Sequence, residues 1–253
     1  EGPNMAGEAH NRSNIEMPKA EIEVLKAIKK VNKPIVAYIF SGRPLAIRNV
    51  DEMVDSILWS GNLGTEAGNA MMDVIFGDYN PSAKLVWTFP TSDGQSPYYY
   101  NHNNTGKPPI DDIWYSSKYI DAPIGVQYPF GYGLSYTSFE YSKLELSDIV
   151  IGVDDTLTVS VNVTNTGSRR GEEVVQLYIH DKVASIVRPV KELKGYKKIS
   201  LEVGETKKVV MELPARTLGF HNQKLEYVVE PGKFDIYVGT NSNDCLQAEF
   251  EIR

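Results

Sequence analysis

The sequence predicts two folds in succession, an α/β unit with a mostly parallel sheet and then an all-β antiparallel sandwich. Helical and strand patterns alternate in residues 1–90, whereas short strand patterns separated by Gly, Pro and Asn fill residues 138–253. A segment rich in Pro, Gly, Tyr and Asn lies between them. We expect this segment, residues 91–137, to be an ordered linker, because its many aromatic side chains would otherwise be exposed.

The α/β part is predicted from hydrophobic periodicity. A helix begins near Pro18, because apolar residues follow it at three-residue steps and therefore share one face. Two short, nearly continuous apolar runs come later, and such runs are typical of strands buried on both faces of a parallel sheet. The predicted elements are a helix with Ile22, Leu25, Ile28 and Val31 on its apolar face, strands at 35–40 and 56–59, and a helix at 65–76.

The sandwich is predicted from strict alternation. Residues 156–163 alternate apolar and polar side chains with a period of two, so one face of that strand is buried and the other is wet. The chain has one cysteine and therefore lacks the Cys…Trp…Cys pattern of immunoglobulin domains, which favours a fibronectin-III-like sandwich. The further predicted strands lie at 174–179, 209–213, 225–229 and 234–238.

Composition excludes several classes of function. The net charge of −7 disfavours a nucleic-acid partner, whose phosphates would repel the chain. No run approaches the ~18 consecutive apolar residues of a membrane helix. The four histidines are scattered without metal-ligand spacing and no nucleotide-binding glycine motif is present, so we expect neither a metal nor a cofactor. Cys245 lies beside an apolar strand, which favours a small buried hydrophobe over a reactive thiol.

Glu8 is the acid whose surroundings best suit chemistry. It lies between Gly7 and Ala9 in a polar, Gly-rich segment that precedes the first helix, and these small neighbours let another group approach its carboxylate. Loops at the mouth of an α/β sheet are where active-site residues collect. The residues alone leave two interpretations open, a catalytic carboxylate and a solvated loop acid.

Short motifs follow one another along nearly the whole chain. They are residues 5–18 around Glu8, Gly42-Arg43-Pro44, residues 59–70, 77–85 and 128–137, and, inside the sandwich, Asn165-Thr166-Gly167 and Glu230-Pro231-Gly232. This combination resembles the β-glucosidases of glycoside hydrolase family 3, and bacterial periplasmic members most of all.

The resemblance implies a fold and a reaction. Members of the family have a TIM-like barrel, then an α/β sandwich, then a fibronectin-like domain, so this chain would begin inside the α/β sandwich and lack the barrel. The enzymes are retaining: an Asp of the barrel attacks the anomeric carbon and a Glu of the α/β sandwich protonates the leaving oxygen, with about 5–5.5 Å between the two carboxyl groups. Glu8 matches the position of that Glu and would act as general acid and then general base.

The resemblance also implies a substrate and further site residues. The whole protein would hydrolyse terminal β-glucosidic bonds of oligosaccharides or aryl β-glucosides, in the periplasm or after secretion, and this chain without the barrel would be inactive. Arg12 is a candidate substrate-binding residue, and it is otherwise expected to orient Glu8 or to tie its loop down. His102, in a loop that approaches the cleft or a partner subunit, is expected to contact substrate.

Other interpretations of the same residues stay open. The protein could be a β-xylosidase of the same family, because the residues that select the sugar belong mainly to the barrel. The sandwich could instead serve as a carbohydrate-binding or adhesion module. A third alternative is a scaffold for oligomerisation, such as a homodimer.

Overall fold

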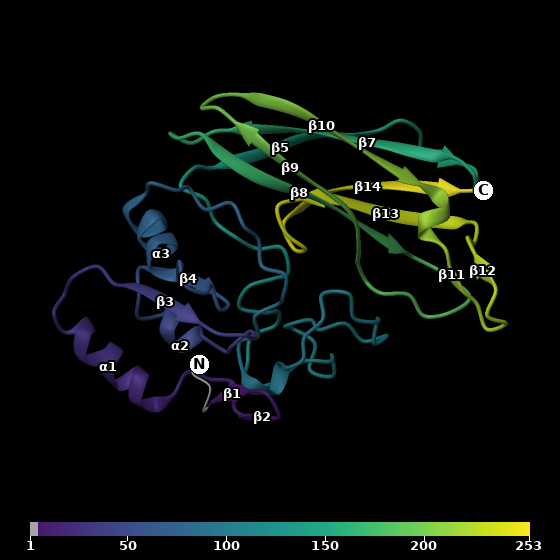
Figure 1. Cartoon of the computed structure of the whole chain (residues 1–253). Helices are drawn as coiled ribbons and strands as arrows, with labels where there is room; N and C mark the ends of the chain where they lie inside the picture. The colour runs from purple at the N-terminus through teal and green to yellow at the C-terminus, as the bar shows by residue number, and fades with distance from the viewer. Residues whose placement is uncertain (1–4) are drawn as a thin grey trace. The chain divides into compact units, whose positions relative to one another are not determined.

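The structure, a computed structural model, describes residues 5–253 and divides the chain into two compact units (Figure 1). Unit 1 holds the chain up to Tyr79 together with Trp87–Tyr99 and Pro109–Tyr128, and unit 2 holds Asn80–Val86, Tyr100–Pro108 and Pro129–Arg253. Residues 91–137, expected to be a linker, therefore contribute to both units. The expected boundaries at 90 and 138 stay predictions.

Unit 1 contains a small hairpin, a parallel pair of strands and short helices. In the parallel pair, Val36 lies opposite Ser56 and Phe40 lies opposite Ser60. The elements are β1 (Ala6–Gly7), β2 (His10–Asn11), α1 (Lys19–Lys29), β3 (Val36–Phe40), α2 (Arg48–Asp51), β4 (Ser56–Ser60), α3 (Ala67–Phe76) and the 3₁₀ helix η1 (Asp93–Gln95).

The parallel pair agrees with the predicted sheet, but the expectation that residues 35–40 are buried on both faces is wrong. Val36 is 50% exposed and Phe40 is 37% exposed, whereas Ile39 is buried. In the described part of the chain β3 pairs with β4 alone, and α1 has no buried residue. An apolar strand is buried only where other layers cover it, and here the covering layers are incomplete.

A small apolar core fixes the segment that follows the hairpin. Ile15, Leu45 and Ile47 are buried. The Ala46 amide donates to the Ile15 carbonyl oxygen at 3.0 Å, and Glu16 forms a parallel bridge with Ala46. The chain between the hairpin and α1 is therefore held against the loop that joins β3 to α2.

Aromatic side chains bring the later segments into unit 1. The Phe89 ring is buried and lies edge-on to Trp59 at 5.4 Å and to Tyr128 at 6.2 Å between ring centroids. The Phe89 amide also donates to the Tyr128 carbonyl oxygen at 2.8 Å. These contacts order a stretch that has little regular secondary structure of its own.

Unit 2 is a sandwich of two antiparallel sheets (Figure 1). One sheet has the strand order β10-β7-β5 and the other has the order β6-β14-β13-β8-β9, with a parallel pairing only between β6 and β14. The elements are β5 (Phe139–Leu146), β6 (Val150–Ile151), β7 (Thr156–Asn165), β8 (Gly171–Asp181), β9 (Glu192–Leu201), β10 (Thr206–Pro214), the 3₁₀ helix η2 (Ala215–Leu218), β11 (Phe220–His221), β12 (Tyr227–Val228), β13 (Gly232–Gly239) and β14 (Cys245–Ile252).

The sandwich core consists of the inward-facing residues of both sheets. The alternation seen in residues 156–163 corresponds to this face, because each second side chain of a strand points to the same side. Its members include Leu157, Val159, Val161, Val175, Leu177, Phe234, Ile236, Phe250 and Ile252. The predicted fold class, an α/β unit followed by an antiparallel sandwich, is confirmed. Within residues 5–253 no helix is both long enough and apolar enough to cross a membrane.

Candidate functional site: the Glu8 hairpin

Glu8 lies at the tip of a tight hairpin in unit 1. The strands β1 and β2 pair antiparallel, with Gly7 opposite His10, so Glu8 and Ala9 form a two-residue turn. The Arg12 amide donates to the Met5 carbonyl oxygen at 3.2 Å and closes the hairpin at its base. The Glu8 side chain is exposed. The sequence motif thus folds into a device that presents one carboxylate to solvent.

The turn has two local features that fix its shape. Ala9, the second residue of the turn, adopts a φ of 65°, in the left-handed region that non-glycine residues seldom enter. His10 Nδ1 lies 2.9 Å from the Glu8 carbonyl oxygen. Because a carbonyl oxygen can only accept, the proton of this hydrogen bond belongs to His10 Nδ1.

Arg43 connects the base of the hairpin to the end of β3. Its Nη1 donates to the Arg12 carbonyl oxygen at 3.0 Å. Arg43 itself is held by a turn at the carboxyl end of the strand, where the buried Ser41 hydroxyl donates to the Arg43 carbonyl oxygen at 2.7 Å. The Ser41 amide in turn donates to the Ser60 carbonyl oxygen at the end of β4.

Asp93 makes a second connection from η1. Its Oδ1 accepts the Ile15 amide proton at 2.9 Å. The 3₁₀ helix is braced by Gln95, whose Oε1 accepts from the Thr91 amide at 2.7 Å and whose Nε2 donates to the Gly125 carbonyl oxygen at 2.9 Å. The Tyr119 hydroxyl donates to the Gly94 carbonyl oxygen. The hydrogen bonds of Gln95 and Tyr119 therefore hold the backbone on which the Asp93 side chain is carried.

The three residues predicted from sequence do not all belong to the same unit. Glu8 and Arg12 lie in unit 1, and Arg12 follows the hairpin directly. The Arg12 guanidinium donates to the Glu16 carbonyl oxygen through Nη1 and Nη2, both at 3.4 Å. This contact joins Arg12 to the segment that follows the hairpin, and the expected roles of Arg12 stay predictions.

His102 lies in unit 2. Its carbonyl oxygen accepts from the Val190 amide at 2.9 Å, and Asn103 forms an antiparallel bridge with Pro189. The imidazole Nδ1 lies 3.0 Å from the Asn103 carbonyl oxygen, and the side chain is exposed. The loop is thus joined to unit 2 by its backbone, and the expected contact of His102 with substrate stays a prediction.

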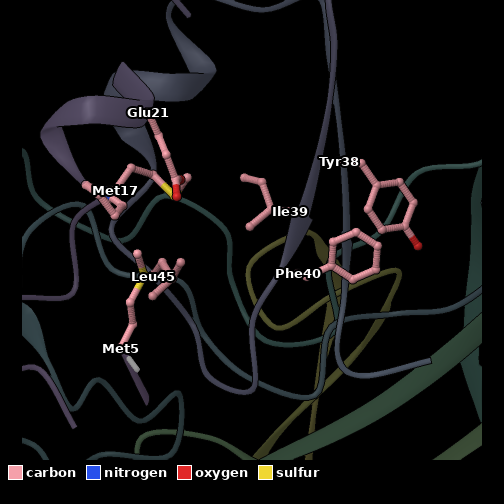
Figure 2. A pocket seen from close by; sticks show the side chains of 8 residues that line it. Met5, Met17, Glu21, Tyr38, Ile39, Phe40 and Leu45 are labelled. Atoms are coloured by element: carbon pink, nitrogen blue, oxygen red, sulfur yellow. The ribbon is translucent and has the colours of Figure 1, made fainter. Parts of the chain in front are cut away.

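A cavity of about 190 Å³ lies near the hairpin base but does not include Glu8. Figure 2 shows Met5 and Leu45 lying together on one side of it, and the Tyr38 and Phe40 rings lying together on another. The cavity is lined by Met5, Met17, Pro18, Glu21, Tyr38, Ile39, Phe40 and Leu45. Its lining is mainly apolar with one carboxylate, so it lacks the paired acids of a glycosidase site.

The geometry defines what the hairpin can do. A general acid or base must come within about 2.6–3.2 Å of the atom that gains or loses the proton. An exposed carboxylate on a short, anchored turn can meet such an atom when a substrate is brought to it. In residues 5–253 no group of three or more His, Cys, Asp or Glu side chains is arranged to hold a metal ion.

Sequence reasoning missed Arg43 and Asp93 as parts of this arrangement. Arg43 had a usable signal, since Gly42-Arg43-Pro44 directly follows a predicted parallel strand, and functional groups collect at that end of such strands. Asp93 had no usable signal, because no motif in the sequence around it relates it to the Glu8 hairpin.

Comparison with known proteins assigns the family. Residues 1–136 match the C-terminal domain of glycosyl hydrolase family 3, and residues 173–242 match a fibronectin type III-like domain. The chain belongs to glycosyl hydrolase family 3. In this family-3 chain the first match contains the Glu8 hairpin, β3 and η1, so the whole candidate site lies inside the family domain.

Two relatives show which activities accompany such sequences. The family-3 chain is 47% identical to a periplasmic β-glucosidase of Salmonella typhimurium, over 100% of this chain and 33% of that protein. It is 42% identical to a β-xylosidase of Formosa agariphila, over 93% of this chain and 32% of that protein. The chain spans about a third of the length of these curated relatives.

Solved structures give the same fold. A β-glucosidase of Listeria innocua in complex with glucose matches with a TM-score of 0.93 and 40% identity, over 98% of this chain and 35% of that chain. A β-glucosidase of Erythrobacter marinus matches with a TM-score of 0.90 and 36% identity, over 98% of this chain and 32% of that chain.

Proposed function

We propose that this chain is the acid/base-bearing part of a retaining exo-acting β-glucosidase, and that Glu8 is the general acid/base. The observation that carries the proposal is the exposed Glu8 carboxylate on an anchored two-residue turn, in a chain of family 3. Relatives and solved structures named as β-glucosidases support the reaction class.

The proposed reaction has two steps. In the first, the protonated Glu8 carboxyl donates its proton to the glycosidic oxygen, while an Asp outside this chain attacks the anomeric carbon and the leaving alcohol departs. In the second, the Glu8 carboxylate takes a proton from water, whose oxygen attacks the same carbon and displaces the Asp. The nucleophile belongs to a barrel domain, so the chain by itself is inactive.

The roles of Arg12 and His102 complete the proposal. Arg12 ties down the chain that follows Glu8, as its contacts with the Glu16 carbonyl oxygen support. His102 contacts the substrate from a loop whose backbone is fixed to unit 2. The protein works in the periplasm or after secretion, which the periplasmic relative supports.

The decisive experiment compares leaving groups in the full-length protein. Glu8→Gln should lower kcat/KM for an alkyl β-glucoside by about 10²–10⁴-fold, because a poor leaving group needs the proton. The loss for 2,4-dinitrophenyl β-glucoside should be much smaller, because this leaving group departs as an anion. Glu16→Gln, an acid in the same segment, serves as the matched control and should change neither value. An equal loss of kcat/KM for both substrates in Glu8→Gln would contradict the acid role.

A second candidate sugar has support of its own. Relatives named as β-xylosidases are 42% and 38% identical to this chain. The two sugars differ by one hydroxymethyl group, and this chain holds only part of the proposed site. The same assay with matched aryl β-xyloside and β-glucoside decides between them, since the larger kcat/KM identifies the substrate.

A further inference from the structure

We propose that Arg43 and Asp93 are positioning residues for Glu8, a proposal that rests on the proposed acid/base function of that residue. Neither side chain is part of the hairpin. Each instead fixes a main-chain group in the segment that follows it, Arg43 at the Arg12 carbonyl oxygen and Asp93 at the Ile15 amide.

The segment between Arg12 and Ile15 is where the hairpin joins the rest of unit 1. The Arg12 amide belongs to the hairpin, since it donates to the Met5 carbonyl oxygen, and the Arg12 carbonyl oxygen receives Arg43. Arg12 is therefore bonded to the hairpin through its amide and to the Arg43 guanidinium through its carbonyl oxygen. The buried Ile15 side chain adds an apolar anchor.

The two positioning side chains come from elements that are themselves braced. Arg43 follows the strand pair β3–β4 and its turn is closed by the Ser41 hydroxyl. Asp93 begins η1, which Gln95 holds through Thr91 and Gly125. Groups held by packed secondary structure set the geometry of a site more precisely than groups on a free loop. Arg43 and Asp93 thus hold the segment after the hairpin at a fixed position relative to the packed elements of unit 1.

The chemistry makes this placement matter. Proton donation to a glycosidic oxygen depends on distance, and a displacement of about 1 Å can cost about 10²-fold in rate. Loss of either contact would leave Glu8 present but free to shift. The rate would then fall mainly for substrates whose leaving group must be protonated by Glu8, and much less for substrates whose leaving group departs as an anion.

The test measures leaving-group dependence in the full-length protein. Arg43→Ala and Asp93→Ala should each lower kcat/KM for an alkyl β-glucoside by about 10–100-fold. Both should lower kcat/KM for 2,4-dinitrophenyl β-glucoside less than about 3-fold, because that substrate hardly needs the acid. Arg48→Ala is the matched control, since Arg48 forms an exposed pair with Glu52 at 3.0 Å. It should change neither value.

Conservative variants separate positioning from mere folding. Asp93→Asn keeps an acceptor oxygen at the same place and should retain the native ratio of the two kcat/KM values. Hydrogen exchange of the chain itself should show faster exchange of the Arg12 and Ile15 amides in Asp93→Ala but not in Asp93→Asn. If Arg43→Ala does not fold, Arg43→Met takes its place, and the same selective loss is expected because methionine keeps an aliphatic side chain but has no donor for the Arg12 carbonyl oxygen.

The outcomes distinguish this inference from the proposed function. If Glu8→Gln is selective for the poor leaving group but Arg43→Ala and Asp93→Ala lower both substrates equally, or neither, the positioning role is wrong and the acid role stands. If Glu8→Gln is not selective, the acid role is wrong and the positioning proposal falls with it. A loss in Asp93→Asn as large as in Asp93→Ala would overturn the assigned contact.

Discussion

Ala9, the neighbour of Glu8, carries an unusual backbone conformation. Its φ of 65° lies in a region that costs a non-glycine residue about 1–2 kcal/mol. The pairing of Gly7 with His10 and the contact of His10 with the Glu8 carbonyl oxygen hold the turn in this form. Backbone strain of this kind collects at functional sites, which agrees with the role proposed for Glu8.

Cys245 shows how burial changes the reactivity of a single residue. The side chain is half-buried, and its Sγ donates to the Asn241 carbonyl oxygen at 3.0 Å. Burial raises the pKa of the thiol from 9.0 to about 11. The thiolate is the reactive form, so folding should protect this residue. The expectation of an unreactive thiol thus has a physical basis, although the side chain is not fully buried.

Alkylation with iodoacetamide at pH 9 tests this directly. About half of the thiol is ionised in the unfolded chain at that pH, against about 1% in the folded chain, so the folded protein should react about 50-fold more slowly. Because the folded pKa of Cys245 is raised, this group stabilises the fold below pH 9, and its contribution is lost as the pH rises from 9 toward 11. Equal rates with and without urea would contradict the assignment.

Among the elements of unit 2, β8 is joined to the 80–86 segment by a buried ion pair. Lys84 Nζ lies 3.0 Å from Glu173 Oε2, with side chains 10% and 3% exposed. The Thr240 hydroxyl donates to Glu173 Oε1 at 2.7 Å, and the Tyr141 hydroxyl does so at 2.8 Å. Burial, and then the Glu173 charge, raise the pKa of Tyr141 far above its usual value. The Glu173 carboxylate is therefore bonded to three side chains that come from separate segments of the chain.

Lys84→Met should lower the free energy of unfolding by about 3–5 kcal/mol, because it leaves the Glu173 charge buried without its cation. Urea unfolding of the chain followed by circular dichroism measures the change. Lys208→Met is the matched control: Lys208 pairs with Glu145 at 2.8 Å on the surface, and such exposed pairs contribute little. If both variants unfold at the same urea concentration, the buried pair does not stabilise the sandwich as argued.

Element prediction succeeded where periodicity was clean and failed where charges interrupted it. The alternation in β7 is strict, and the strand was predicted. By contrast, β9 contains Lys194, Lys197 and Lys198, which break the apolar pattern. The sequence pattern did not predict β9, β5 or β14. β9 lies at the edge of its sheet, where charged side chains, lysine above all, are common.

At the scale of the whole molecule, both compact units are built from separate stretches of sequence. Residues 80–86 and 100–108 belong with the sandwich, whereas 87–99 and 109–128 belong with the α/β part. In unit 2, Tyr100 stacks on Phe130 at 4.3 Å and lies edge-on to the buried Tyr178 at 5.8 Å between ring centroids. The composition of the middle segment gave no sign of this alternating membership. The expectation that its aromatic side chains are covered is wrong for several of them, since Trp114 is 86% exposed and Tyr115 is 75% exposed.

The proposed division of the active site predicts a result for the chain as a whole. Because the nucleophile is proposed to lie outside these residues, the pure chain should not hydrolyse 4-nitrophenyl β-glucoside, while the full-length protein should. The measurement is release of 4-nitrophenol at equal molar concentration. Turnover by the pure chain that Glu8→Gln abolishes would place the nucleophile within these residues and contradict the proposal.

The sequence by itself determined the order of the two folds, the family and the identity of Glu8 as the candidate acid, since these follow from local periodicity and contiguous motifs. Only the tertiary structure decided what holds Glu8 in place, because Arg43 lies 31 residues from Arg12 and Asp93 lies 78 residues from Ile15. It also decided that β3 is partly exposed. Contacts between distant residues, and the burial of a strand, depend on the path of the whole chain, and no local pattern records that path.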